Sequence, residues 1–396
     1  MSDSPIFGNW NLWGIMKRIL VLFSVLFLFA CSANKKTAEI GKINFRVSDF
    51  SEAQSQARDT GKLLLAYFYT DWWGSCKRLD QLVFTTKDFA DYINANYVAM
   101  KLNGDTDLGR KLRNNWLVPG YPTMVLFTAE GEEIDRIVGF GGKKDEYFQT
   151  VKDYTNGKNT LKDLMVHVEN DPNNARLYFD IANKYNDRGE DEKALHYYEK
   201  VLELETDHSS DMYLQAEYNV AESKAYAADN PDYLQHYAKT CTDDNLKYYA
   251  YSSLARFFRM KKDQANVISV YEEALTVLPD NASMMNSYAW YIFQNEVSDY
   301  YERGIEIARQ AVEIEPEADS IWDTLGQLLF AAGYTDQAIE AMQRAVDLAP
   351  EETSYKNNLQ RYKSARSWQS DLMYFGLVLF LHFALIWKWK IFNITI

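Results

Sequence analysis

The apolar positions between residues 44 and 156 come in short runs separated by polar stretches. Three runs have the length and the bounding turn residues of buried strands, and they span residues 62–68, 97–102 and 124–127. The segments 76–96 and 108–115 are mixed in polarity, which predicts helices. Residues 134–140 follow a Glu-Gly-Glu turn and predict the second strand of a hairpin. The order strand, helix, strand, helix, strand, strand, helix predicts an α/β domain.

The second half of the chain has an internal period of about 34 residues that begins after Asp171. The last unit shows it most clearly, with large and small residues at fixed spacing: Trp322, Leu325, Gly326, Leu329, Gly333, Ala338, Met342, Ala345 and Pro350. This pattern resembles the tetratricopeptide repeat (TPR), in which each unit is a helical hairpin that stacks on its neighbours. Four clear units, and a degraded one over 211–242 broken at Asn230-Pro231, predict an all-α solenoid over residues 165–360. The resemblance implies a groove that binds a protein or peptide partner.

A seven-residue segment after the first predicted strand carries a second resemblance. It has the sequence Asp-Trp-Trp-Gly-Ser-Cys-Lys and spans residues 71–77. Four of its residues match the active-site motif W-C-G-x-C-K of the thioredoxin family, namely Trp72, Gly74, Cys76 and Lys77. Pro122, in the sequence Tyr-Pro-Thr, matches the family's cis-proline opposite that motif. Residues 44–158 are therefore similar to this family, which implies an α/β thioredoxin-like fold.

The motif departs from the family at the position of the first cysteine. Trp73 stands where the family has the thiolate that attacks a disulfide, and a tryptophan cannot act as a nucleophile. Tyr67 stands where thioredoxin has a buried acid that assists proton transfer. Cys76 stays the candidate catalytic residue, either as a lone thiol that forms a mixed disulfide with a partner or as a small structural side chain. Because no cluster of Cys and His surrounds it, we predict no metal site.

The same turn is also a candidate binding site. Trp72, Trp73, Tyr121 and Pro122 are the candidate binding residues, because exposed aromatic side chains beside a backbone edge suit the capture of an extended peptide. The alternative is that Trp73 only fills the vacated active site.

Composition and charge restrict the partners. The chain has 396 residues, of which 47% are apolar, and a net charge of −14. Residues 161–360 hold 17 Lys and Arg against 37 Asp and Glu, a net charge of −20. So acidic a segment disfavours nucleic acid and attracts basic partners, although the charge can also serve only to keep the surface solvated. Nothing in the sequence predicts a cofactor.

The N-terminal region predicts export and anchoring. Met16-Lys17-Arg18 precedes an apolar run of twelve residues, which is typical of a signal peptide and short for a membrane span. The run ends in Leu-Phe-Ala-Cys, which resembles the processing box of bacterial lipoproteins. The resemblance implies a signal over residues 16–31, a lipid on Cys31 and a place in the bacterial cell envelope, membrane-anchored and facing the periplasm. A plain signal peptide with a chance cysteine is the alternative.

The C-terminal segment 368–392 is apolar and rich in tryptophan. Three interpretations stay open for it: a spanning helix, a helix lying on the membrane surface, and an artefact of the gene end beyond a natural stop near Ser364.

Together these features predict an envelope lipoprotein in which a thioredoxin-like domain and a repeat array bind proteins or peptides. The alternative is a thiol-disulfide oxidoreductase that acts through Cys76, so whether the chain is an enzyme stays open.

Overall fold

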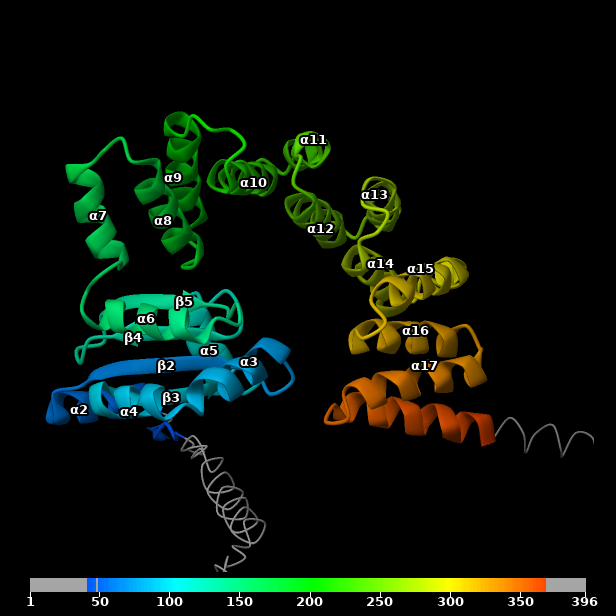
Figure 1. Cartoon of the computed structure of the whole chain (residues 1–396), viewed down its shortest axis with the longest axis horizontal. Helices are drawn as coiled ribbons and strands as arrows, with labels where there is room; N and C mark the ends of the chain where they lie inside the picture. Colours follow the sequence, from blue (N-terminus) through cyan, green and yellow to red (C-terminus); the bar gives the residue numbers. More distant parts are fainter. Residues whose placement is uncertain (1–40, 48, 368–396) are drawn as a thin grey trace, which may run out of the picture. The chain divides into compact units, whose positions relative to one another are not determined.

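The computed structural model describes residues 41–47 and 49–367, which divide into two compact units (Figure 1). The first unit holds the described residues up to 170 together with 184–190, and the second holds 171–183 and the residues from 191 onward. The predicted lipoprotein signal 16–31, Cys31 and the tail 368–392 lie outside the described residues, so lipid anchoring and envelope location stay predictions. None of the described helices combines the length and the apolar character needed to cross a membrane.

The first unit is built on one five-stranded sheet. Its strands are β1 (Phe45–Val47), β2 (Leu63–Tyr69), β3 (Tyr97–Asn103), β4 (Thr123–Phe127) and β5 (Glu133–Val138). Their order in the sheet is β1-β3-β2-β4-β5. The pairs of β3 with β1 and β2 are parallel, and β4 runs antiparallel to β2 and β5. The α/β prediction is therefore confirmed, with each predicted strand within two residues of its observed bounds.

Helices cover both faces of this sheet. They are α2 (Phe50–Thr60), α3 (Gly74–Leu79), α4 (Lys87–Asn96), α5 (Asp107–Asn115) and α6 (Lys144–Thr155). Helix α7 (Leu161–Asn170) follows α6 in the chain. The central strand β2 is buried on both sides, so its alternate side chains enter two different cores. Leu64 and Phe68 pack in the core that contains α2 residues, whereas Leu65 and Tyr67 pack in the core that contains residues of α3, α4 and α6.

One predicted helix proved to be two. The segment 76–96 was expected to be continuous, but α3 is followed by a wider π-helical turn, Asp80–Phe84, and α4 begins only at Lys87. The break falls at Thr85 and Thr86, whose hydroxyls donate to the carbonyl oxygens of Gln81 (2.6 Å) and Val83 (2.7 Å). Such side-chain bonds compete with helical backbone bonds, and a pattern of apolar positions does not report them.

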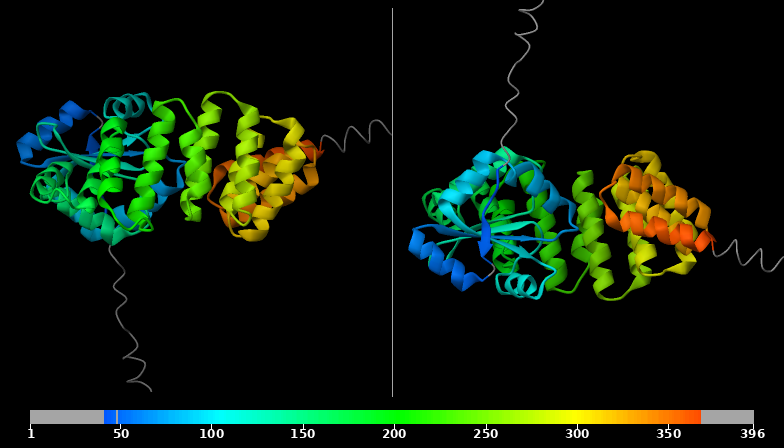
Figure 2. Two further views of the ribbon diagram at one scale, coloured as in Figure 1. Left: turned by 90° about the horizontal axis from the view of Figure 1, so that it is seen from above. Right: turned by 90° about the horizontal axis from the view of Figure 1, so that it is seen from below.

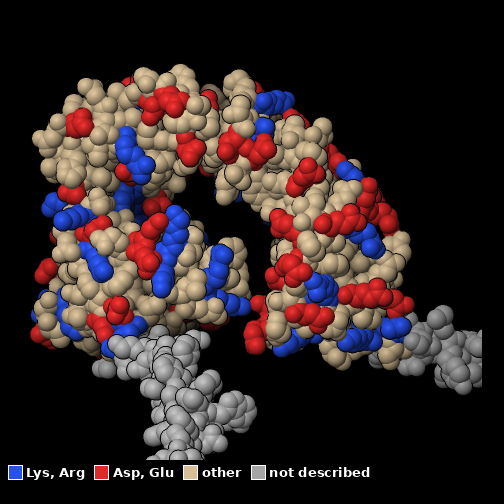
Figure 3. Space-filling model, viewed as in Figure 1, with Lys and Arg blue, Asp and Glu red and all other residues tan. Residues whose placement is uncertain are grey.

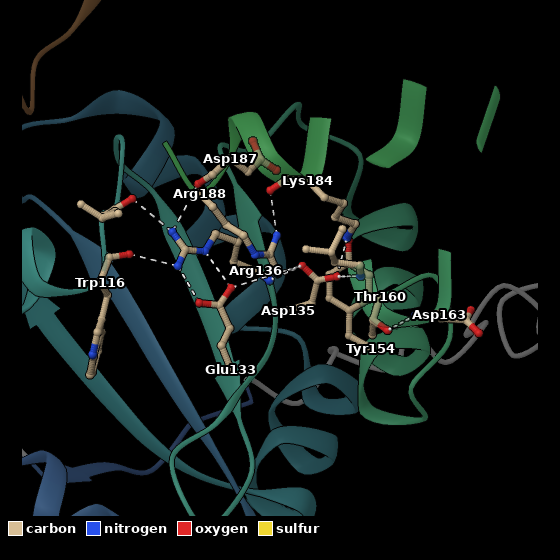
Figure 4. A network of polar contacts seen from close by, with 12 residues as sticks. Trp116, Glu133, Asp135, Arg136, Tyr154, Thr160, Asp163, Lys184, Asp187 and Arg188 are labelled. Carbon is tan, nitrogen blue, oxygen red and sulfur yellow. Dashed lines mark hydrogen bonds and ion pairs between the residues drawn. The ribbon is translucent and has the colours of Figure 1, made fainter. Parts of the chain in front are cut away.

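A buried ion network ties the last strand of the sheet to the segment 184–190 within the first unit (Figure 4). The Asp135 carboxylate, on β5, has no exposed surface and lies 2.8 Å from both the Lys184 Nζ and an Arg188 guanidinium nitrogen. It also accepts the backbone N–H of Leu161 at 2.9 Å. Next to it, the Arg136 guanidinium donates to Glu133 and to the carbonyl oxygen of Trp116. Every charge in this network has an opposite charge beside it, as a buried charge requires.

The second unit is a stack of helical hairpins (Figures 1 and 2). Their helices are α8 (Ala175–Asn186), α9 (Asp191–Leu204), α10 (Asp211–Ala227), α11 (Asp232–Thr240), α12 (Asp244–Met260), α13 (Gln264–Val277), α14 (Ala282–Gln294), α15 (Tyr301–Ile314), α16 (Asp319–Ala331) and α17 (Thr335–Leu348). Residues 353–367 are also helical. The all-α prediction is confirmed, and so is the break at Asn230-Pro231, which separates α10 from α11.

A small residue sets the distance between the helices α16 and α17. A Cβ on Gly326 would lie 3.2 Å from Cε and 3.3 Å from the backbone nitrogen of Met342, so α16 and α17 meet closely there. Large aromatic side chains fill the space between neighbouring hairpins, as Tyr271 and Tyr288 show with stacked rings 4.9 Å apart. One hairpin cannot bury these side chains alone, which is why the units stabilise one another.

Candidate functional site

The candidate site is the loop that follows β2. Hydrogen bonds join it to the end of the parallel neighbour β3 and to the loop after it: Asn103 Nδ2 donates to Asp71 Oδ2 at 2.8 Å, and the Trp72 indole Nε1 donates to Asp105 Oδ2 at 2.9 Å. The carboxyl ends of neighbouring parallel strands lie at one edge of a sheet, where ligands commonly bind in α/β folds. The structure therefore holds Trp72 in one orientation at such an edge.

Trp73 lies at the N-terminus of α3. Its backbone is extended, with φ −81° and ψ 118°, and its carbonyl oxygen accepts the N–H groups of Cys76 (3.0 Å) and Lys77 (3.2 Å). Its side chain does not cap the helix. The Trp72 and Trp73 rings meet edge to face with centroids 5.7 Å apart, and these side chains are 59% and 46% exposed. Trp73 therefore does not fill the vacated cysteine position as a buried plug.

Cys76 is 2% exposed, although it lies in the first turn of α3. Burial raises the pKa of the Cys76 thiol and outweighs a hydrogen bond with the Thr70 backbone, which lowers it. A thiol of this kind is mostly protonated at neutral pH and out of reach of a disulfide in solution. The other described cysteine, Cys241, is also buried and unpaired. The structure thus describes Cys76 with the properties of a packed side chain.

The charge of a carboxylate, that of Asp80, does act on the Cys76 thiol, but it comes from a different position than the family pattern suggests. Tyr67 is fully buried, and burial raises the pKa of its hydroxyl, with the charge of Asp80 adding to the effect. Asp80, four residues after Cys76, forms an ion pair with the Lys101 Nζ at 2.6 Å. The Lys101 Nζ is also 5.3 Å from the centre of the Tyr67 ring. Sequence reasoning missed this pair, and the only available signal was the helical spacing of Asp80 from Cys76.

Tyr121 and Pro122 form the other part of the predicted site. Their peptide bond is cis. A Cβ on Gly104 would lie 1.9 Å from the Tyr121 hydroxyl, so the tyrosine side chain fills the space that this glycine leaves. Gly104 precedes Asp105, the partner of Trp72, and one short loop therefore contacts both aromatic residues. Pro122 is buried, and its carbonyl oxygen accepts the N–H of Gly139 at 2.7 Å. Among the predicted binding residues, the two tryptophans are thus the most exposed.

Comparisons with known proteins agree with the folds of the two parts of the chain. Residues 50–155 match the family model of the thioredoxin-like domain, and residues 175–208 and 319–352 match that of the tetratricopeptide repeat. The chain contains a thioredoxin-like domain followed by tetratricopeptide repeats. No group of three or more His, Cys, Asp and Glu residues within 41–47 and 49–367 is placed to hold a metal ion.

Relatives of the thioredoxin-like domain carry names from disulfide chemistry. The thiol:disulfide interchange protein DsbD of Ralstonia nicotianae is 31% identical over 96 residues, which cover 24% of this chain and only 16% of that protein. The solution structure of "a putative disulphide-isomerase from Bacteroides thetaiotaomicron" is 35% identical and covers 30% of this chain and 96% of its own, with a TM-score of 0.27. For the repeat array, the crystal structure of YrrB, "a TPR protein with an unusual peptide-binding site", is 16% identical and covers 49% of this chain and 96% of its own, with a TM-score of 0.34.

Proposed function

We propose that this chain is a protein- and peptide-binding module in which the thioredoxin-like domain binds without dithiol catalysis. The observation that supports this most strongly is the difference in exposure between Trp73 and Cys76. The position of the first cysteine holds an exposed tryptophan, whereas the remaining cysteine is buried and its thiol has a raised pKa. The site therefore offers a contact surface where related enzymes have a nucleophile.

The chemistry of the two tryptophans suits an extended, partly apolar segment of a polypeptide. Tryptophan is among the residues that contribute most to binding energy at protein interfaces. The bond from Trp72 to Asp105 fixes one ring before a ligand arrives, which lowers the entropy cost of binding. The edge-to-face contact with Trp73 fixes the second ring against the first. The occupant we propose is an unfolded or extended segment of a partner, bound by its apolar side chains.

The alternative function, thiol-disulfide exchange through Cys76, requires a different state of the site. The thiol would have to reach solvent and lose its proton, and a second thiol would have to come from another molecule. The names of the thioredoxin-like relatives favour redox chemistry, but the match to DsbD covers only 16% of that protein. We therefore rank binding above catalysis.

Binding of an unfolded polypeptide without cysteine thiols tests the proposal. We expect the full chain to bind reduced, carboxymethylated α-lactalbumin, and Trp73→Ala to weaken binding by about tenfold, a loss of about 1.4 kcal/mol. The repeat array is expected to keep part of the affinity in that variant. Isothermal titration calorimetry on the full chain measures the dissociation constants of the wild type and of Trp73→Ala, and so gives the loss and the remaining affinity.

The matched control is Tyr233→Ala, which removes an exposed aromatic side chain of α11 that is 43% accessible. This variant should bind as the wild type does. Equal binding by Trp73→Ala and the wild type would overturn the role of the tryptophan. Because the alkylated ligand has no free thiol, any binding observed is independent of mixed-disulfide formation.

A further inference from the structure

Helix α12 of the repeat array borders two pockets of opposite charge, one at each half of the helix. The pocket at its first half has a volume of about 520 Å³. Asp211, Asp243, Tyr218 and Tyr249 are among its lining residues. The Tyr218 and Tyr249 rings lie with their centroids 6.4 Å apart, and Tyr249 is 53% exposed. Carboxylates beside aromatic faces form a site that attracts a cation.

The pocket at the second half of α12 has a volume of about 570 Å³. Arg256, Arg259 and Lys262 line it together with Tyr291 from α14. The Arg256 guanidinium forms an ion pair with Glu222 and donates to the Tyr226 hydroxyl at 2.9 Å, so its position is fixed. The Arg259 guanidinium lies 5.9 Å from the Tyr291 ring centre. This arrangement attracts a carboxylate.

The basic pocket is an exception within the array. Residues 161–360 carry a net charge of −20, yet the segment Arg256–Lys262 holds four cationic residues and no acidic one. Figure 3 shows how acidic side chains are spread along the helices α13 to α17. Asp263 also lines the basic pocket and caps α13 by accepting the N–H of Asn266 at 3.1 Å, as Asp243 of the acidic pocket caps α12 by accepting the N–H of Leu246 at 2.8 Å. The three cationic residues of the basic pocket still outnumber this one carboxylate. The charge at this pocket is thus the reverse of its surroundings.

Both pockets are lined by residues of α12. Tyr249 and Arg259 are ten residues apart, which is just under three helical turns and about 15 Å along the axis. An extended peptide advances about 3.3–3.6 Å per residue, so about four residues span that distance. We propose that these two pockets bind an extended peptide segment that carries a Lys or Arg about four residues from an Asp or Glu. The cationic side chain enters the acidic pocket, and the carboxylate is bound by Arg259 and Lys262.

This inference rests on the proposed peptide-binding function of the array and adds the chemistry of the ligand. Binding at two pockets of opposite charge differs from attraction by the net charge of the array. An array with a charge of −20 that binds only through its overall field should prefer the most basic peptide. A polarised site should instead prefer a peptide with one charge of each sign, and that preference should persist at physiological salt, where long-range attraction is screened.

Three fluorescein-labelled octapeptides separate the two cases. They share a neutral sequence and differ at positions 2 and 6, which hold Lys and Glu, Lys and Lys, or Glu and Glu. We expect the full chain to bind the mixed peptide about tenfold more tightly than either of the others in fluorescence anisotropy at physiological salt. The order Lys-Lys, then Lys-Glu, then Glu-Glu would overturn the proposal, and so would equal binding of all three. Inorganic phosphate should not displace the mixed peptide at equimolar concentration, whereas displacement by it would assign the basic pocket to small anions and overturn the peptide site.

A charge reversal tests which residues set this preference. The double variant R259E/K262E should prefer the Lys-Lys peptide, because both pockets are then acidic. The matched control is K356E/K363E, which makes the same change in net charge at two exposed lysines of the helical segment 353–367 and should keep the preference for the mixed peptide. An unchanged preference in R259E/K262E would contradict the assignment. The binding of unfolded polypeptide at Trp73 is measured separately, so its result stands whatever the octapeptides show.

Discussion

The substitution Trp73→Cys is expected to give this protein a redox-active dithiol that the wild type lacks. Position 73 lies at the N-terminus of α3, where the helix dipole lowers the pKa of a thiol. The N–H of Cys76 bonds to the carbonyl oxygen of residue 73 at 3.0 Å, so both side chains leave the same helical turn. That spacing is within reach of a disulfide. We therefore expect a reversible couple with a potential between about −270 and −120 mV, the range of natural pairs of this kind.

Equilibration in glutathione buffers followed by alkylation and mass spectrometry measures this potential in the full chain. The matched control is Tyr233→Cys, which places a new cysteine on an exposed part of α11. It should show no couple in this range of potentials, because it adds no thiol to the turn that holds Cys76. If Trp73→Cys stays reduced in oxidised glutathione, the turn does not have the geometry described here.

The substitution Asp135→Ala is expected to lower the free energy of unfolding of the first unit strongly. It removes the carboxylate that lies 2.8 Å from both Lys184 and Arg188. Those two cations have side chains only 10% and 11% exposed. Arg188 would keep its ion pair with Glu133 at 3.0 Å, whereas Lys184 would stay buried after losing the carboxylate at 2.8 Å. Breaking a buried ion pair on one side costs about 3–5 kcal/mol of unfolding free energy. Hydrogen–deuterium exchange of β4 and β5 peptides in the full chain reports this loss as a lower free energy of opening.

Asp107 provides the control, because it also pairs with an arginine but is fully exposed to solvent. Asp107→Ala should leave the exchange of β4 and β5 unchanged, since water and salt screen an exposed pair. Similar exchange in Asp135→Ala and the wild type would show that the network does not stabilise the first unit.

The elements of both units could be predicted because their signals are local. The apolar run 62–68 and the repeat spacing around Gly326 each report burial within a few residues. The break at Thr85 was missed, since side-chain bonds to nearby carbonyl oxygens override the apolar pattern.

The contacts that shape the site and the network could not be predicted, because they join residues far apart in the chain. Trp72 and Asp105 are 33 positions apart, and Arg188 and Asp135 are 53. Comparison with the motif showed that Trp73 replaces a cysteine, but it could not predict whether the tryptophan ring would be buried or exposed. That depends on how the loops after β2 and β3 are held together, which only the fold specifies.

The rate at which the full chain reduces insulin disulfides with dithiothreitol tests the central claim most directly. The claim is that the thioredoxin-like site binds and does not exchange disulfides, so the wild type and Cys76→Ser should both match the rate without protein. Trp73→Cys serves as the positive control and should be faster. A wild-type rate well above background that Cys76→Ser abolishes would contradict the account and assign this site to thiol-disulfide exchange.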